Sequence, residues 1–129
     1  MFITKIITEE WTENKNDIRI NIPDIDLIEN EIKKLDGKVK TMLTLETDGN
    51  ENLIIGGGPD YFIVTGTLDN EEYILINDKS EEEFIELNAG GQYSEFPLNQ
   101  CQKISNVLIA AKTFAIDGVF DKSLIWRKA

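Results

Sequence analysis

Histidine is absent from the 129-residue chain, and cysteine occurs once, as Cys101. Without histidine, the chain cannot build a Ser-His-Asp or Cys-His catalytic centre, a His-ligated metal site or the commonest general base. One cysteine forms neither an internal disulfide nor a thiolate zinc site, and this usage is typical of the reducing cytoplasm. Any enzyme would have to work with carboxylates, Tyr, Lys or Ser alone, and no spacing in the sequence picks out one pair of carboxylates as a general acid and base. We therefore expect a protein that is not an enzyme and binds no metal or cofactor, with Cys101 as a buried, unreactive thiol.

Long apolar runs are also absent. No stretch of about 18 apolar residues is available to span a membrane, and the N-terminal segment reaches the acidic Glu9 too early for the apolar core of a signal peptide. With 41% hydrophobic and 29% charged residues, the composition is that of a globular protein, and the length is typical of one domain. We therefore expect a single domain over residues 1–129 that is cytoplasmic and does not contact membranes.

Basic residues are scarce. Thirteen Lys and Arg stand against twenty-four Asp and Glu, which leaves a net charge of -11. The imbalance is concentrated in residues 46–95, where thirteen acidic residues accompany a single base, Lys79. This balance argues against direct binding of nucleic acid, because neutralising phosphates requires clustered Lys and Arg. Two interpretations of the acidic segment stay open. It either serves solubility, despite its self-repulsion, or forms a surface complementary to a basic partner.

Hydrophobic periodicity predicts the elements of the fold. Apolar residues recur at helical spacing in Asp24–Leu35, and again from Ile104 until Gly118, which ends the second helix. Short segments separated by turn residues are predicted as strands: Phe2–Trp11, Lys40–Thr47, Asn52–Ile55, Tyr61–Leu68, Glu72–Asn77, Glu83–Leu87, Gln92–Leu98 and Ser123–Trp126. The predicted fold class is α+β, a mainly antiparallel sheet of about six to eight short strands with two amphipathic helices packed on one face.

Glycine-rich and acidic turns are assigned structural roles. Gly56–Gly58 is not a phosphate loop, because no Lys-Ser/Thr follows it and the next element is a strand; it is predicted as a backbone turn with positive φ. Asp48–Glu51 lacks the acid spacing of a calcium loop and is predicted as a tight hairpin turn. We expect Trp126 to pack the last strand onto the last helix.

The segment 83–98 is predicted as a hairpin closed by Gly90-Gly91. Period-two alternation then directs one set of side chains inward: Ile85, Leu87, Phe96 and Leu98. The opposite face carries two aromatics among three carboxylates, an arrangement typical of an interface anchor: Glu82, Phe84, Glu86, Tyr93 and Glu95. In the alternative interpretation a helix covers this face and the aromatics belong to the core, because a register slip of one residue exchanges the faces.

The order of several short motifs resembles a known family. These motifs are Asn52–Gly58, Tyr61–Thr65, Gly90-Gly91-Gln92, Phe96-Pro97, Ala110–Phe114, Gly118 and Ile125-Trp126. Over residues 40–127 the chain is similar to the first of the numbered immunity-protein families (Imm-one) of bacterial polymorphic toxin and contact-dependent inhibition systems. The resemblance implies a non-enzymatic inhibitor made beside its toxin, often a nuclease or a nucleic-acid deaminase. It supplies no catalytic residues and no interface.

The interface prediction therefore comes from this sequence. A toxin that processes nucleic acid needs a positive groove, which an acidic protein occludes by presenting phosphate-like charge. Exposed acids and aromatics of the acidic segment are the predicted contacts with the cognate toxin domain: Asp60, Tyr61, Asp69, Glu71, Glu72, Glu82, Phe84, Glu86, Tyr93 and Glu95. The alternatives are a small-molecule-binding or regulatory module and an acidic DNA mimic directed at another nucleic-acid-binding protein. We expect a monomer or weak dimer, because a free edge strand can pair with a copy of itself.

Overall fold

A computed structural model of the chain describes residues 1–21 and 23–129. This part of the chain forms nine strands and two α-helices, with one short 3-10 helix, η1, at Leu98–Gln100. The helices are α1 (Ile25–Lys33) and α2 (Ile104–Asp117). The strands are β1 (Lys5–Trp11), β2 (Lys15–Asn21), β3 (Lys40–Glu46), β4 (Asn52–Gly57), β5 (Phe62–Leu68), β6 (Glu71–Ile76), β7 (Phe84–Ala89), β8 (Gln92–Pro97) and β9 (Ile125–Lys128).

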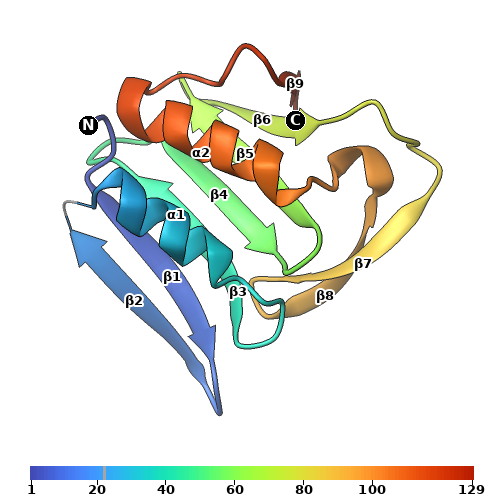
Figure 1. The fold of residues 1–129 in the computed structure, drawn as a ribbon, viewed down its shortest axis with the longest axis horizontal. Coiled ribbons are helices and arrows are strands. Elements are labelled where there is room, and N and C mark those ends of the chain that lie inside the picture. Colours follow the sequence, from blue (N-terminus) through green and yellow to red (C-terminus); the bar gives the residue numbers. More distant parts are fainter. Residues whose placement is uncertain (22) are drawn as a thin grey trace.

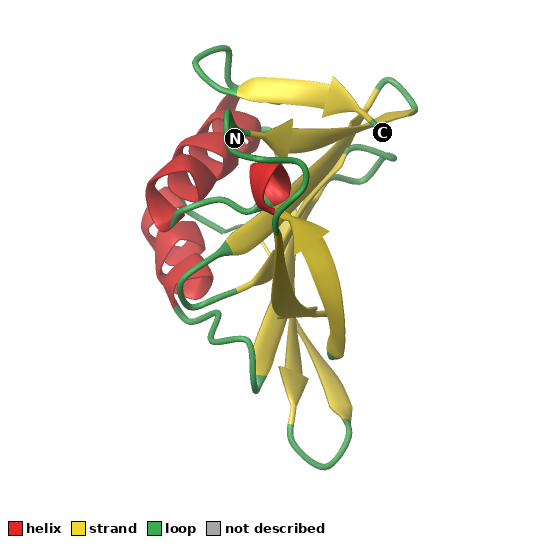
Figure 2. Cartoon of the chain, turned by 90° about the vertical axis from the view of Figure 1, so that its right-hand side faces the viewer, coloured by secondary structure: helices red, strands yellow, loops and turns green. Residues whose placement is uncertain are grey.

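Seven of these strands form one antiparallel sheet in the order β2-β1-β3-β4-β5-β6-β9, and β7 and β8 form a separate two-stranded sheet. Both α-helices lie together on one side of the seven-stranded sheet (Figures 1 and 2). The predicted α+β class with helices on one face is confirmed. Among the described residues, no helix combines the length and the hydrophobicity needed to cross a membrane.

The core lies between the helices and the sheet. Alternate residues of β3 and β4 point into it, and α1 and α2 contribute their apolar stripes. Its largest fully buried apolar side chains come from both layers: Phe62, Phe114, Ile6, Ile28, Ile32, Leu43, Leu45, Leu53, Ile55, Leu75 and Val64. Apart from Leu87 and Cys101, the buried apolar side chains of the described residues form one cluster, which is the expected result of placing helices on a single face of the sheet.

The helix predictions are confirmed with small changes at the ends. The carboxylate of Asp24 accepts a hydrogen bond from the Leu27 N–H at 2.8 Å and so begins α1. This helix ends at Lys33, before the predicted Leu35. Helix α2 ends as predicted, because Gly118 adopts the left-handed conformation at φ 69° that a residue with a Cβ disfavours.

The N-terminal strand prediction was wrong at its start. Strand β1 begins at Lys5 rather than Phe2, because the N–H groups of Phe2 and Ile3 both donate to the carbonyl of Ala115 in α2, at 2.8 and 3.3 Å. The Phe2 ring packs edge-on against Phe114 with ring centroids 5.7 Å apart. The first residues are therefore fixed to the end of α2 instead of extending the sheet.

Strand β2 was not predicted, which is why the structure exceeds the expected six to eight strands. Five of its seven residues are polar, and all but one of its residues are exposed. An edge strand has one hydrogen-bonded neighbour and needs no continuous apolar pattern. The backbone pairing with β1, from Lys5↔Asn21 to Trp11↔Lys15, forms this strand.

The glycine turn was predicted in part. Gly57 and Gly58 have φ values of 96° and 98°, as expected for a turn that requires glycine. Gly56 belongs to β4. Leu53 and Ile55 of this strand point toward the helices, so a side chain at position 56 would point to the opposite side of the sheet. A Cβ placed on Gly56 would lie 2.7 Å from the Cβ of Ala89, so the β7–β8 hairpin packs onto this far face at the position where β4 lacks a side chain.

Candidate functional site

The β7–β8 hairpin exposes most of one of its two faces, although Asn88 at the closed end of this face is buried. The register pairs Phe84 with Pro97, Glu86 with Glu95 and Asn88 with Tyr93. Phe84 is 55% exposed and Tyr93 is 62% exposed, whereas Leu87 on the other face is 7% exposed. The interpretation in which these aromatics are core residues is therefore wrong, and the predicted outward direction is confirmed.

Glu86 and Glu95 lie directly opposite each other in the middle of this exposed face. Side chains in such cross-strand pairs are neighbours, and like charges there destabilise the hairpin by roughly 0.2–1 kcal/mol. Within the described residues, no Lys or Arg lies within ion-pair distance of either carboxylate. The face thus holds concentrated negative charge with no internal cation, between two exposed aromatic rings.

Two further predicted residues of the hairpin differ from expectation. β7 begins at Phe84, so Glu82 lies in the loop before the strand, where its N–H donates to Ser80 Oγ at 3.0 Å. Glu82 still borders the exposed face together with the exposed Glu81 and Glu83. Leu98 lies in η1 rather than in β8: its N–H still donates to the Glu83 carbonyl, but its own carbonyl accepts a hydrogen bond from the Cys101 N–H at 3.1 Å, so the chain turns there.

The hairpin is fixed to the rest of the fold at its closed end. The N–H of Gly91 donates to Thr41 Oγ1 at 2.9 Å, and the buried Asn88 side chain donates to the Gly37 carbonyl at 3.2 Å. A Cβ on Gly91 would lie 2.3 Å from the Trp11 ring, so only glycine allows the turn to approach β1 this closely. The exposed face is therefore presented on an anchored element, not on a free loop.

The predicted contacts Asp60 and Tyr61 lie in the loop between β4 and β5. The Tyr61 ring is covered by the Lys103 Nζ, which lies 4.1 Å from the ring centroid. This cation–π contact stabilises the loop against the start of α2. It also places a positive charge beside the loop, which makes it a less suitable contact for a basic partner than the hairpin.

The other predicted contacts, Asp69, Glu71 and Glu72, lie at the opposite end of β5, near its turn into β6. Glu71 is held by Lys128, whose Nζ lies 2.8 Å from it, and accepts a hydrogen bond from the Tyr73 hydroxyl at 3.0 Å. These two hydrogen bonds lower the pKa of Glu71. The ten predicted residues therefore form three separate groups, and only the hairpin group combines acids with exposed aromatics.

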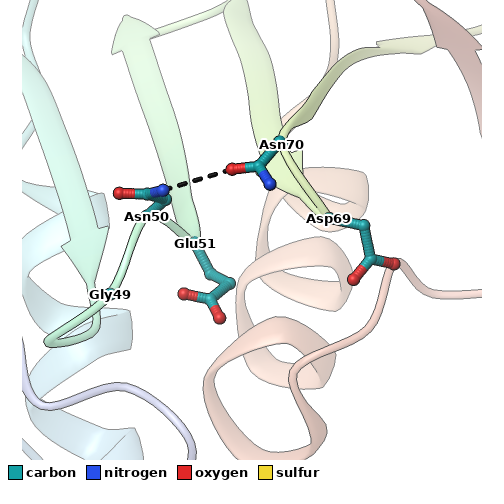
Figure 3. Close-up of a pocket in the computed structure, with 5 residues that line it drawn as sticks. All are labelled: Gly49, Asn50, Glu51, Asp69 and Asn70. Carbon is teal, nitrogen blue, oxygen red and sulfur yellow. Dashed lines mark hydrogen bonds between the residues drawn. The ribbon is translucent and has the colours of Figure 1, made fainter.

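A shallow cavity of about 280 Å³ lies between the β3–β4 and β5–β6 turns, lined by Gly49, Asn50, Glu51, Asp69 and Asn70. Asn50 Nδ2 donates to Asn70 Oδ1 at 3.1 Å across it, and the carboxylates of Glu51 and Asp69 point away from this amide pair (Figure 3). Ligand pockets are usually about 300–1,000 Å³ and mostly apolar. This polar cavity gives no support to the small-molecule alternative.

Cys101 and Trp126 both pack against other residues of the fold. Cys101 is buried, and desolvation raises the pKa of its thiol to about 11. The Trp126 ring stacks on Phe120 at 4.4 Å between centroids, and Phe120 in turn stacks on Phe114 of α2. Over residues 1–21 and 23–129, no group of three or more Cys, Asp or Glu side chains is arranged to hold a metal ion.

Comparison of the sequence with protein-family models and with curated protein sequences gives no match. The resemblance to immunity proteins thus remains a prediction.

Sequence reasoning missed the residues that position the candidate surface, above all Gly56 and Thr41. Gly56 was assigned to a turn together with its two neighbours. The signal that was available is its parity: it follows Leu53 and Ile55 in a strand and is the first outward position without a side chain. A glycine of this kind marks the close approach of another backbone, here at Ala89.

Proposed function

We propose that this chain is an immunity protein that binds a cognate toxin domain and occludes a basic, nucleic-acid-processing surface with the exposed face of the β7–β8 hairpin. The observation that carries the proposal is the uncompensated pair Glu86 and Glu95, opposed across two strands between Phe84 and Tyr93. Two like charges at such a position reduce stability, so selection for stability alone would not retain them.

The charge of the surface indicates the partner. A basic groove that binds nucleic acid presents Lys and Arg side chains, and each of them gains a carboxylate partner at this face. Opposite fields accelerate encounter and reject other partners. The toxin therefore removes the repulsion between Glu86 and Glu95 when it binds, so part of the stored repulsion becomes binding free energy.

The aromatic residues supply the second component. Phe84 and Tyr93 expose more than half of their surface in the free protein. Buried aromatic side chains dominate the binding energy of many interfaces, and surrounding polar contacts exclude water from them. In this proposal the two rings enter apolar recesses beside the basic groove and set the lifetime of the complex.

The anchoring of the hairpin provides preorganisation. Because Gly91 and Asn88 tie its closed end to β3 and to the α1–β3 loop, little conformational freedom is lost on binding. The absence of histidine is consistent with an inhibitor that performs no chemistry of its own.

The decisive experiment is a calorimetric titration of the purified chain with the toxin domain encoded beside it, at low and at high salt. We expect 1:1 binding with nanomolar or tighter affinity that weakens as salt rises. The double variant Glu86→Gln/Glu95→Gln should bind more weakly and with less salt dependence. The single variants Glu86→Gln and Glu95→Gln are compared with Glu72→Gln as their matched control, because it also removes one exposed strand carboxylate but lies on β6, away from the hairpin.

The possible results distinguish the immunity function from the location of its interface. If Glu72→Gln weakens binding as much as the hairpin variants do, the effect comes from net charge, and the hairpin is not part of the interface. Tight binding that ignores salt and both variants would retain the inhibitor and relocate its interface. No binding at all would overturn the immunity function, and a thermal-shift screen with metabolites would then test the alternative of a small-molecule-binding or regulatory module.

A further inference from the structure

Strand β2 is an open edge of the seven-stranded sheet. It pairs along its whole length with β1, and no described strand pairs with its other side. In Figure 1 it forms the outer border of the sheet, away from β9 at the other edge. A seven-residue edge of this kind presents a row of unpaired backbone N–H and C=O groups, which is a template for another strand.

The side chains of β2 indicate which strand fits. Ile18 is one of the exposed large hydrophobic residues, at 38%, and it lies at the centre of the strand. Asp17 and Arg19 flank it with opposite charges. Among the described residues, no carboxylate lies within ion-pair distance of Arg19. In this part of the chain, the only cation within ion-pair distance of Asp17 is Lys15, at 3.7 Å.

An antiparallel pairing of β2 with a second β2 can be examined register by register. Centred on Ile18, the pairing places Asp17 opposite Arg19 twice, once on each side of the axis. Oppositely charged cross-strand pairs of this kind are stabilising. The same register places the two Ile18 side chains together at the centre, where they cover each other.

The two neighbouring registers that keep the helices of both copies on the same side of the joined sheet are unfavourable. Centred on Asp17, the pairing opposes two Asp17 carboxylates and places Lys15 opposite Arg19. Centred on Arg19, it opposes two guanidinium groups. Like charges directly opposite are destabilising, so of these three registers only the one centred on Ile18 brings complementary charges together.

We propose that two copies of the chain associate through β2, antiparallel and centred on Ile18, so that the sheet continues across both molecules. Paired residues of a sheet point to the same face, so the helices of both copies lie on one side of the joined sheet. Each copy keeps its own β7–β8 hairpin, because the hairpin packs against Gly56 of β4 and not against β2. The proposal is independent of the function proposed above.

Charge exchange tests the register. Asp17→Arg gives a strand with two cations, and Arg19→Asp gives one with two anions, so each variant opposes like charges in its own dimer. We expect the dimer dissociation constant of each to rise about tenfold or more. A mixture of the two variants restores both complementary pairs and should form a heterodimer, and the double exchange Asp17→Arg/Arg19→Asp should dimerise like the original chain. Sedimentation equilibrium over a range of concentrations measures all four.

Two controls keep the test interpretable. Arg127→Asp makes the same charge change on β9, the other edge strand, and should leave dimerisation unchanged. Thermal unfolding of each variant identifies any that fails to fold, and the heterodimer arm needs only that each variant folds. Hydrogen exchange of the β2 amides should become slower with increasing protein concentration.

Three results would overturn the proposal. The first is an original chain that stays monomeric throughout the concentration range. The second is a chain that dimerises while the mixture of charge variants behaves no differently from either variant alone, which would place the contact elsewhere. The third is protection of the β2 amides only when the toxin domain is added, which would assign the edge to a strand of that partner.

Discussion

Glu86 of β7 and Glu95 of β8 are direct cross-strand partners on the exposed side of an anchored hairpin. In an antiparallel pair of this kind opposite charges stabilise the sheet, and like charges directly opposite destabilise it. Here the repulsion between the carboxylates has no compensating cation within the described part of the chain. The pair thus links stability and recognition, because a change that relieves the repulsion also removes the charge offered to a partner.

Replacing Glu86 with lysine should make the free protein more stable. The new ammonium group lies opposite Glu95 and converts a repulsive pair into an attractive one, which raises the free energy of unfolding by about 0.5–1 kcal/mol. The same change should weaken binding of the toxin domain. Urea unfolding measures the first effect and calorimetry the second.

Glu72→Lys is the control for this variant, since it makes the same change in net charge on β6, away from the hairpin. Its stability should change by less than that of Glu86→Lys, and its toxin affinity should stay close to that of the original chain. Equal stabilisation by both variants would show that the total charge, and not the cross-strand pair, governs stability.

The local elements could largely be predicted from the sequence, because their periodicity is strong. Period-two alternation on both sides of Gly90-Gly91 predicts which side chains of the hairpin point outward, and the exposed Phe84 and Tyr93 agree with it. Strand β2 could not be predicted, since an edge strand with mostly exposed side chains has no apolar pattern to detect.

The grouping of the candidate site could not be predicted for a different reason. Asp69 and Glu86 both belong to the acidic segment, but the order of strands in the sheet separates them. The number of residues between two positions in such a chain of strands does not tell which strand ends lie close together. The packing of Ala89 on Gly56 depends on a contact between residues 33 positions apart, which local patterns do not encode.

Gly56→Val should displace the hairpin. A Cβ at this position lies 2.7 Å from the Cβ of Ala89, so the hairpin or β4 must shift to accommodate it. Overpacking of this kind destabilises by about 1–3 kcal/mol, and we expect a lower urea midpoint together with weaker toxin binding. Gly49→Ala is a suitable control, because its nearest neighbour is the flexible end of the Glu51 side chain. Unchanged stability of Gly56→Val would show that the hairpin is not seated on β4.

Cys101 should resist thiol reagents in the folded protein. It is 1% exposed, its Sγ lies 3.4 Å from the Pro97 carbonyl oxygen, and desolvation raises the pKa of its thiol to about 11. Only the thiolate reacts, so alkylation at pH 8 should proceed at the rate of unfolding and become fast in denaturant. Mass spectrometry after timed quenching measures this. Rapid modification under native conditions would contradict the burial of the thiol.

Asp36 should contribute pH-dependent stability. Its carboxylate accepts hydrogen bonds from the N–H groups of Lys38, Val39 and Lys40, at 2.9, 3.0 and 3.0 Å, and so shapes the loop between α1 and β3. Desolvation opposes ionisation, but these backbone hydrogen bonds outweigh it and lower the pKa of Asp36. Asp36→Ala should therefore lower the free energy of unfolding near neutral pH by about 1–2 kcal/mol, a range that allows for solvent screening of an exposed group.

The sign of the pH dependence follows from that lowered pKa of Asp36. Above the pKa of the unfolded chain, near 3.8, the carboxylate is ionised in both states, and its whole contribution is present. As the pH falls from there through the lower folded pKa, the folded state must take up a proton and the contribution is lost. The stability difference between the original chain and Asp36→Ala should thus be constant from pH 7 to about pH 5 and shrink below about pH 4. Asp60→Ala, which removes an exposed carboxylate from the β4–β5 loop, provides the comparison, and a difference for Asp36→Ala that persists undiminished in acid would show that these backbone hydrogen bonds do not depend on the charge.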